Sequence, residues 1–123
     1  MNKLRRAAPV ALLAGFGVLV WPALAAGPRI VASPNPVHRG EVVRIHGTVP
    51  GCARGDQVTL ISRAFSHRND FAGLPAVFAR VGAHHAYSVK TRIPARRPPR
   101  RYRITGRCGG GNLGVSANLR VLR

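Results

Sequence analysis

Apolar and polar residues alternate with a period of two along most of the chain after Pro28. Val43 and Ile45, for example, have one parity, whereas Arg44 and His46 have the other. Successive side chains of a β-strand point to opposite faces, so this pattern predicts strands with one apolar face and one solvated face. Because antiparallel sheets commonly pack one face and expose the other, the alternation predicts an all-β chain.

Clusters of glycine, proline, asparagine and aspartate divide this alternating region into seven short segments. These residue types favour turns, so each segment between them is predicted to form one strand. We expect strands near Arg29–Ala32, Glu41–Val49, Asp56–Phe65, Ala76–Val81, Ala86–Ile93, Arg101–Cys108 and Leu113–Leu122. Seven short strands separated by turns are typical of an antiparallel β-sandwich.

The N-terminal residues have the three-part pattern of a secretory signal peptide. A basic start, an apolar run and a small-x-small cleavage motif follow one another, at Lys3, Arg5 and Arg6, at Ala7 to Trp21, and at Ala23-Leu24-Ala25. Spanning a bilayer takes about 20 apolar residues, and this run is shorter. We therefore predict a cleaved signal peptide at residues 1–25, a single domain at residues 26–123, and no transmembrane segment in the mature chain.

The predicted mature chain contains two cysteines, Cys52 and Cys108. In small exported domains an even number of cysteines usually forms disulfides, because the compartment is oxidising. We therefore predict a Cys52–Cys108 disulfide and an extracytoplasmic location, either secreted or associated with the cell envelope. In the chain-entropy model, closing a loop of this length stabilises the fold by about 4 kcal/mol.

Three segments share the layout of a known class of domains: Ser33-Pro34-Asn35-Pro36-Val37, Gly40-Glu41-Val42-Val43, and the strand that begins at Tyr102. In this layout the chain resembles immunoglobulin-like and fibronectin-III-like domains of secreted bacterial proteins. The resemblance implies a seven-stranded antiparallel immunoglobulin-like β-sandwich in which Tyr102 is the tyrosine corner. It also implies that Cys52 and Cys108 lie at the same end of the sandwich, within disulfide range. Antibody domains carry a core tryptophan, whereas the single tryptophan here, Trp21, lies in the predicted signal.

The net charge of the chain is strongly positive, at +17. Without the three bases of the predicted signal, the net charge of +17 becomes +14. This value already includes the three acids of the chain, Glu41, Asp56 and Asp70. Such a charge attracts polyanions to a protein. We expect an anionic polymer of the cell envelope or an acidic protein as the partner. The alternative is that the arginines follow from the coding bias of the genome and have no role.

Arginines are densest between the fifth and sixth expected strands, in the run Arg96-Arg97-Pro98-Pro99-Arg100-Arg101. Guanidinium groups pair with phosphate and carboxylate oxygens through two parallel hydrogen bonds. We therefore assign a candidate polyanion-binding site to Arg96, Arg97, Arg100, Arg101 and Arg103. A solvated loop is the alternative. Specific recognition of nucleic acid is not expected, because neither a groove-fitting helix nor a set of stacking aromatics accompanies the run.

A glycine-rich run is the second candidate contact, and it comprises Gly109, Gly110, Gly111 and Asn112. Its exposed N–H groups would form an anion-binding nest, but the run lacks the Lys-Ser/Thr of a P-loop. The alternative is a tight turn beside the disulfide. The adjacent His84 and His85 have no further ligands at a suitable spacing, so we predict no metal site and no cofactor.

Catalytic residues are scarce in this sequence. A glycosidase would have to draw its paired carboxylates from three acids, and no Gly-x-Ser-x-Gly motif occurs. We therefore expect that the chain is not an enzyme but a secreted, non-catalytic binding or structural module with a basic contact surface. A small-molecule carrier with a cleft between loops or sheets stays open as an alternative, as does a cationic antimicrobial or toxin-like protein.

Overall fold

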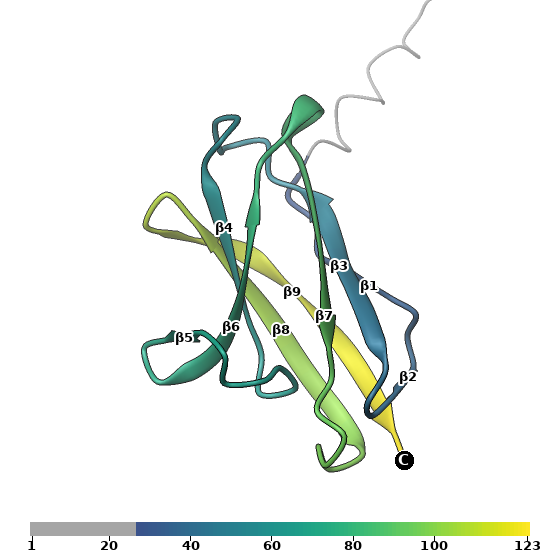
Figure 1. Ribbon diagram of the computed structural model, residues 1–123. Helices are drawn as coiled ribbons and strands as arrows, with labels where there is room; N and C mark the ends of the chain where they lie inside the picture. The colour runs from purple at the N-terminus through teal and green to yellow at the C-terminus, as the bar shows by residue number, and fades with distance from the viewer. Residues whose placement is uncertain (1–26) are drawn as a thin grey trace, which may run out of the picture.

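The computed structural model describes residues 27–123, so the predicted signal peptide at residues 1–25 lies outside the described residues. The described chain folds almost entirely into strands, which confirms the all-β prediction (Figure 1). The strands are β1 (Val31–Ser33), β2 (Val37–His38), β3 (Val42–Thr48), β4 (Gln57–Ile61), β5 (Asp70–Phe71), β6 (Leu74–Arg80), β7 (Ala86–Arg92), β8 (Arg100–Cys108) and β9 (Gly111–Leu122).

The strands form two sheets that curl around a common core. One sheet has three strands in the order β1-β3-β7, and the other has six in the order β2-β9-β8-β4-β6-β5. Neighbouring strands are antiparallel, except that β2 pairs with the end of β9 in parallel. Strands β8 and β9 form the longest pairing within residues 27–123, from Arg100↔Val121 to Cys108↔Gly111.

The predicted number of seven strands is wrong, because the described chain has nine. The seven expected segments correspond to the longer strands, and the two that were not expected, β2 and β5, have two residues each. A period-two pattern cannot be recognised over two residues, so such strands are found only from their tertiary pairing. The expected third strand also ends early, at Ile61. Beyond it the chain turns, with the Phe65 N–H donating to the Ser62 carbonyl at 3.1 Å.

The helical content of the described residues is one 3₁₀ turn, η4 (Ala83–His85), between β6 and β7. His84 and His85 both have positive φ there, at 56° and 57°. None of the helical structure in residues 27–123 is long and apolar enough to cross a membrane.

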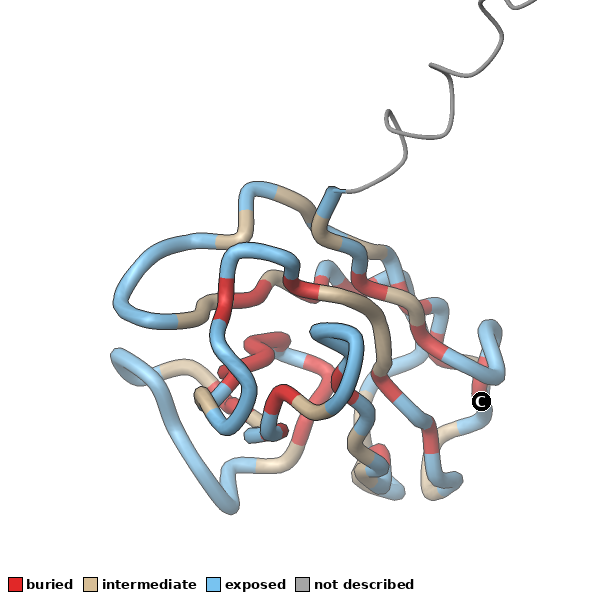
Figure 2. Tube along the Cα trace, turned by 90° about the horizontal axis from the view of Figure 1, so that it is seen from above, coloured by how far each residue is buried: buried red, intermediate tan, exposed pale blue. Residues whose placement is uncertain are grey.

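The core includes the apolar positions that the alternation placed on one face, together with residues outside that pattern, such as Phe65 in the turn after β4. Figure 2 shows buried residues alternating with exposed residues along the chain. Both sheets contribute, since Val43 and Ile45 lie on β3 whereas Ile104 and Leu119 lie on β8 and β9. The largest fully buried side chains are Phe65, Ile45, Leu60, Ile93, Ile104, Leu119, Val37, Val43, Val49, Val58 and Val121. The apolar parity predicted from sequence is therefore confirmed for these strands.

The disulfide joins Cys52 to Cys108, as predicted, with their Cα atoms 6.4 Å apart. It connects the loop after β3 to the end of β8, residues separated by 56 positions in the sequence. His85 is held beside it, because its Nδ1 lies 2.9 Å from the Cys52 carbonyl oxygen. A disulfide of this kind is compatible with an extracytoplasmic location.

The segment before β1 is attached to the three-stranded sheet by a close contact at Gly47. A Cβ atom at this position would collide with the Arg29 carbonyl and would lie 2.9 Å from the Tyr87 hydroxyl oxygen. The Tyr87 hydroxyl donates to that same carbonyl at 2.8 Å, and the Arg29 N–H donates to the Thr48 carbonyl at 2.9 Å. Burial raises the pKa of Tyr87 to about 12, because the phenolate would lose its hydration.

Candidate functional site

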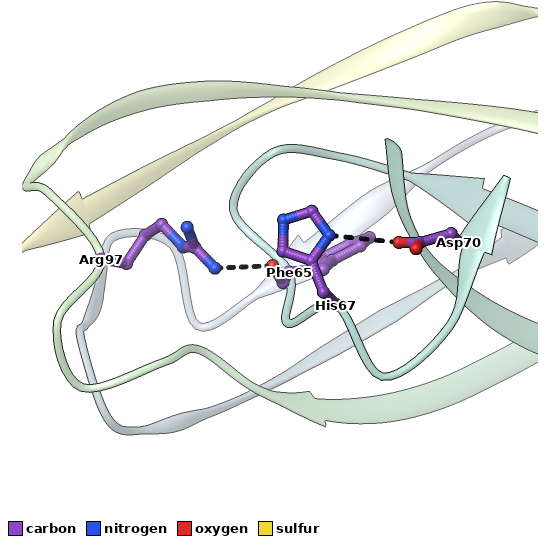
Figure 3. A network of polar contacts seen from close by, with 4 residues as sticks. All are labelled: Phe65, His67, Asp70 and Arg97. Atoms are coloured by element: carbon purple, nitrogen blue, oxygen red, sulfur yellow. Dashed lines mark hydrogen bonds and ion pairs between the residues drawn. The ribbon is translucent and has the colours of Figure 1, made fainter. Parts of the chain in front are cut away.

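The predicted arginine cluster does not act as one unit, because the structure assigns its members different environments. Arg96 is exposed in the loop between β7 and β8. Arg97 is half-buried, and its guanidinium donates to the Phe65 carbonyl at 2.9 Å (Figure 3). Its Nε atom is buried without a hydrogen-bond partner among the described residues. Arg97 therefore fastens this loop to the segment after β4, and its guanidinium is less available to a ligand than that of Arg96.

The other three predicted arginines, Arg100, Arg101 and Arg103, line a groove of about 360 Å³ at the start of β8. Strand β4 ends at Ile61, so this part of β8 lacks β4 as a neighbour. Arg63, from the segment after β4, lines the same groove and is exposed. We call this hollow, which these four arginines line, the arginine groove.

Sequence reasoning missed Arg63, because it was placed within an expected strand. The turn that begins at Ser62 makes it part of the groove instead. The run of alternating residues offered no sign of that turn. Only the tertiary structure shows that Arg63 lines the groove.

A smaller hollow of about 220 Å³ shares Arg63 and Arg100 with the arginine groove and also contains Arg97 and His67. His67 is bonded to Asp70, with Nδ1 and Oδ1 3.1 Å apart (Figure 3). Within residues 27–123, this is the one contact of ion-pair length between a basic and an acidic side chain. The guanidinium groups of the arginine groove consequently have no carboxylate partner in the described chain.

Like charges also face one another across the β8–β9 ladder. Arg101 lies directly opposite Arg120, and Arg103 lies opposite Asn118. Like charges in directly opposite positions of an antiparallel pair destabilise it by up to about 1 kcal/mol. A bound anion would relieve this repulsion. Arg120 was not among the predicted site residues, because its position depends on the register of β9 against β8.

Arg100 and Tyr102, which both line the arginine groove, contact each other. The Arg100 guanidinium carbon lies 5.1 Å from the centre of the Tyr102 ring, within the range of a cation–π contact. Tyr102 is buried, and its hydroxyl donates to the Pro98 carbonyl four residues upstream. This hydrogen bond fixes the ring, and the ring in turn limits where the Arg100 side chain can lie.

Gly109 and Gly110 of the glycine-rich run form the tight turn between β8 and β9, and Gly111 and Asn112 are the first residues of β9. Gly109 and Gly110 have φ values of 62° and 87°, which favour glycine in two-residue hairpin turns. The Arg107 guanidinium donates to the Gly110 carbonyl at 2.9 Å and to the Asn112 side-chain oxygen at 2.8 Å. These contacts agree with the turn alternative. The turn lies at the opposite end of β8 from the arginine groove, so the two predicted sites are separate.

The histidines do not assemble into a metal-binding cluster with other ligands. Across the described part of the chain, no three histidine, cysteine, aspartate or glutamate side chains gather closely enough to hold a metal ion. His84 and His85 lie in η4, where His85 contacts the Cys52 carbonyl.

Comparison with known proteins identifies a fold but no family. No protein-family model matches the sequence, and no curated protein matches it. Among solved structures, the chain is similar to the alkylpurine DNA glycosylase AlkC of Pseudomonas fluorescens bound to DNA containing an abasic site analog. The TM-score is 0.52 at 14% sequence identity, and the match covers 77% of this chain but 29% of the glycosylase.

This neighbour corrects one of our expectations, namely that the chain is not an enzyme. The similar region belongs to an enzyme, so the expectation is overturned and we withdraw it. The physical reason is that a fold does not determine chemistry, and a small β-domain is compatible with a catalytic protein. At this identity the likeness shows the fold alone, and it assigns no activity to this chain.

Proposed function

We propose that this chain is an exported binding module that holds an anionic, phosphate-bearing polymer of the cell envelope in the arginine groove. The observation that carries the proposal is that Arg63, Arg100, Arg101 and Arg103 line one groove and have no carboxylate partner among the described residues. Guanidinium forks match phosphate oxygens in geometry and charge. The repulsion between Arg101 and Arg120 adds a reason for an anion to bind here.

A polymer fits this surface better than a small anion, because the positive charge extends beyond the groove. The net charge of +17 falls by the three bases of the predicted signal to +14, and this charge would draw a long anion onto the protein. The structural neighbour was solved with DNA, itself a phosphate polymer, which supports the ligand class and not the identity of the ligand.

We further propose an immunoglobulin-like or fibronectin-III-like layout, exported by the signal at residues 1–25. Two observations support the layout: the division into sheets β1-β3-β7 and β2-β9-β8-β4-β6-β5, and the hydrogen bond from the Tyr102 hydroxyl to Pro98. The second is the contact expected of a tyrosine corner. In this layout the arginine groove lies at the opposite end of β8 from the disulfide.

The experiment measures binding of fluorescent inorganic polyphosphate to protein purified after export of the full chain. We compare the wild type with Arg101→Glu/Arg103→Glu and with a matched control, Arg44→Glu/Arg54→Glu. The control has the same change in net charge at exposed residues outside the arginine groove. We expect the Kd to rise at least about tenfold in the groove variant and less than about threefold in the control.

Salt dependence and a second polymer complete the test. Each phosphate contact contributes roughly 0.7 to 0.9 to the slope of log K against log salt, so the groove variant should have a visibly smaller slope. Equal losses in the two double variants would show that net charge alone is responsible and would overturn the groove. Equal binding of polyglutamate and polyphosphate would overturn the preference for phosphate.

A further inference from the structure

Strands β6 and β7 both have an open edge on the side where the two sheets approach each other. Strand β7 is the last strand of the three-stranded sheet, and it pairs with β3 on one side only. On β6, the side away from β4 is covered by β5 at Leu74 and Pro75 and by the bond from the Ala76 N–H to the Asn69 carbonyl, and within the described chain it is open beyond Ala76. Figure 1 shows both strands leaving the turn that joins them.

The hydrogen bonds at the ends of β7 determine which of its peptide groups point to the open side. His85 and Ile93 bond toward β3, since His85 accepts from Val49 and the Ile93 N–H donates to Glu41, each at 2.9 Å. The register of β7 against β3 is regular between them. Peptide groups alternate in direction along a strand, so those of the even-numbered residues Ser88, Lys90 and Arg92 point away from β3.

The same reasoning applies to β6. Pro75 accepts from the Ser62 N–H at 3.2 Å, and the Val81 N–H donates to Asp56 at 2.9 Å, so the odd-numbered residues bond toward β4. The peptide groups of Phe78 therefore point to the open side. None of the open-edge groups of β7 at Ser88, Lys90 and Arg92 has a backbone partner among the described residues. Unpaired edges of this kind readily accept a further strand.

A groove of about 690 Å³ lies between the two edges. Its apolar part comes from Val77, Phe78 and Val89, and the Phe78 side chain is 38% exposed although it is large and hydrophobic. Its polar part includes three cations, Arg68, Lys90 and Arg92, and no acidic side chain of the described chain lines it. The groove thus combines apolar contacts, positive charge and a row of free hydrogen-bonding groups.

These three properties determine what kind of occupant fits. An occupant that pairs with the free peptide groups of a strand edge must itself have an extended backbone. To contact the apolar residues of the groove it must carry apolar side chains at alternate positions. The cations Arg68, Lys90 and Arg92 require an acidic segment. A second copy of this chain fits poorly, because its own strongly positive charge would be repelled by the cations that line the groove.

We propose that an extended acidic segment of a partner protein binds in this groove as a strand added to the free edge of β7. Its backbone pairs with Ser88, Lys90 and Arg92, its alternate apolar side chains contact Phe78 and Val89, and its carboxylates contact the cations. The three-stranded sheet becomes four-stranded. This site is distinct from the arginine groove and goes beyond the proposed function, because it recognises a protein segment through its backbone.

The test uses the full exported chain and a capped peptide of alternating valine and aspartate, about eight residues long, the length of a strand. Binding is followed by fluorescence anisotropy, and amide hydrogen exchange is measured with and without peptide. We expect a Kd below about 1 mM and exchange that slows at least about tenfold at the amides of Ser88, Lys90 and Arg92. A peptide N-methylated at alternate residues, which lacks half of the N–H donors, should bind at least about tenfold more weakly.

Two charge-reversal variants provide the matched control. Lys90→Glu should weaken peptide binding at least about tenfold, whereas Arg54→Glu, an equal change at an exposed residue outside the groove, should weaken it less than about threefold. Polyphosphate binding should be nearly unchanged in Lys90→Glu, and peptide binding nearly unchanged in Arg101→Glu/Arg103→Glu, so failure of one site is distinguishable from failure of the other. Absence of binding, or binding without slower exchange on β7, would overturn the proposal.

Discussion

Replacing Gly47 with alanine is expected to lower the free energy of unfolding by about 3 kcal/mol, for a reason that is visible in one contact. The added Cβ would collide with the Arg29 carbonyl. The two nearest atoms, the carbonyl oxygen and carbon of Arg29, belong to the backbone, so they cannot move aside by a change of rotamer. The segment before β1 must instead separate from β3.

Two hydrogen bonds are lost in this separation, and their cost gives the magnitude. They run from the Arg29 N–H to Thr48 and from the Tyr87 hydroxyl to the Arg29 carbonyl, at 2.9 and 2.8 Å. Each contributes about 1 kcal/mol, and the Tyr87 hydroxyl, left without a partner in a largely buried position, costs about 1 kcal/mol more. The midpoint of thermal unfolding should fall by about 10 to 20 °C in a domain of this size.

Gly51→Ala is the matched control. Both substitutions remove a glycine and reduce the entropy of the unfolded chain equally, but a Cβ at residue 51 would meet nothing within 4 Å. The assay is urea unfolding of the oxidised proteins, followed by circular dichroism, with Tyr87→Phe and the double variant Gly47→Ala/Tyr87→Phe in the same series. The double variant should lose less than the sum of the single losses, because both changes remove the same hydrogen bond. A loss below about 1 kcal/mol in Gly47→Ala, or equal losses in the two glycine variants, would refute this reasoning.

Three further predictions concern the disulfide, the buried phenol and the arginine loop. Thiol titration of the unfolded, unreduced protein should detect no free thiol from Cys52 or Cys108, and replacing both with serine should lower stability by about 4 kcal/mol in the chain-entropy model, measured by urea unfolding. Because burial raises the pKa of Tyr87 from its usual 10.0 to about 12, its contribution to stability is fully present below pH 10.0 and is lost as the pH rises toward 12; spectrophotometric titration of the wild type and of Tyr87→Phe should show that Tyr87 ionises late, and ionisation of Tyr87 near pH 10.0 would contradict this. Arg97→Ala should lower the free energy of unfolding by about 1 to 2 kcal/mol through its lost bond to the segment after β4, whereas Arg96→Ala should change it little, and equal losses in the two variants would contradict the structural role given to the Arg97 bond.

The sequence by itself determined the strands and their buried faces. The alternation around Val43 and Ile45 is local, and a strand has one apolar face wherever it packs, so the pattern predicts burial without knowledge of the neighbours. The disulfide followed from the number of cysteines and the expected compartment. The same local reasoning could not find β2 and β5, because two residues are too few for a period.

Tertiary structure alone decided which predicted residues form a site. Arg97 and Arg96 are neighbours in sequence, but the position of Phe65 makes one a structural contact and leaves the other exposed. Register set Arg101 opposite Arg120, and the turn after β4 brought Arg63 to the same groove. Strand register and the closeness of distant segments depend on how the whole core packs, and no local pattern encodes them. The open edges of β6 and β7 have the same origin, because an edge exists only once the order of strands in each sheet is fixed.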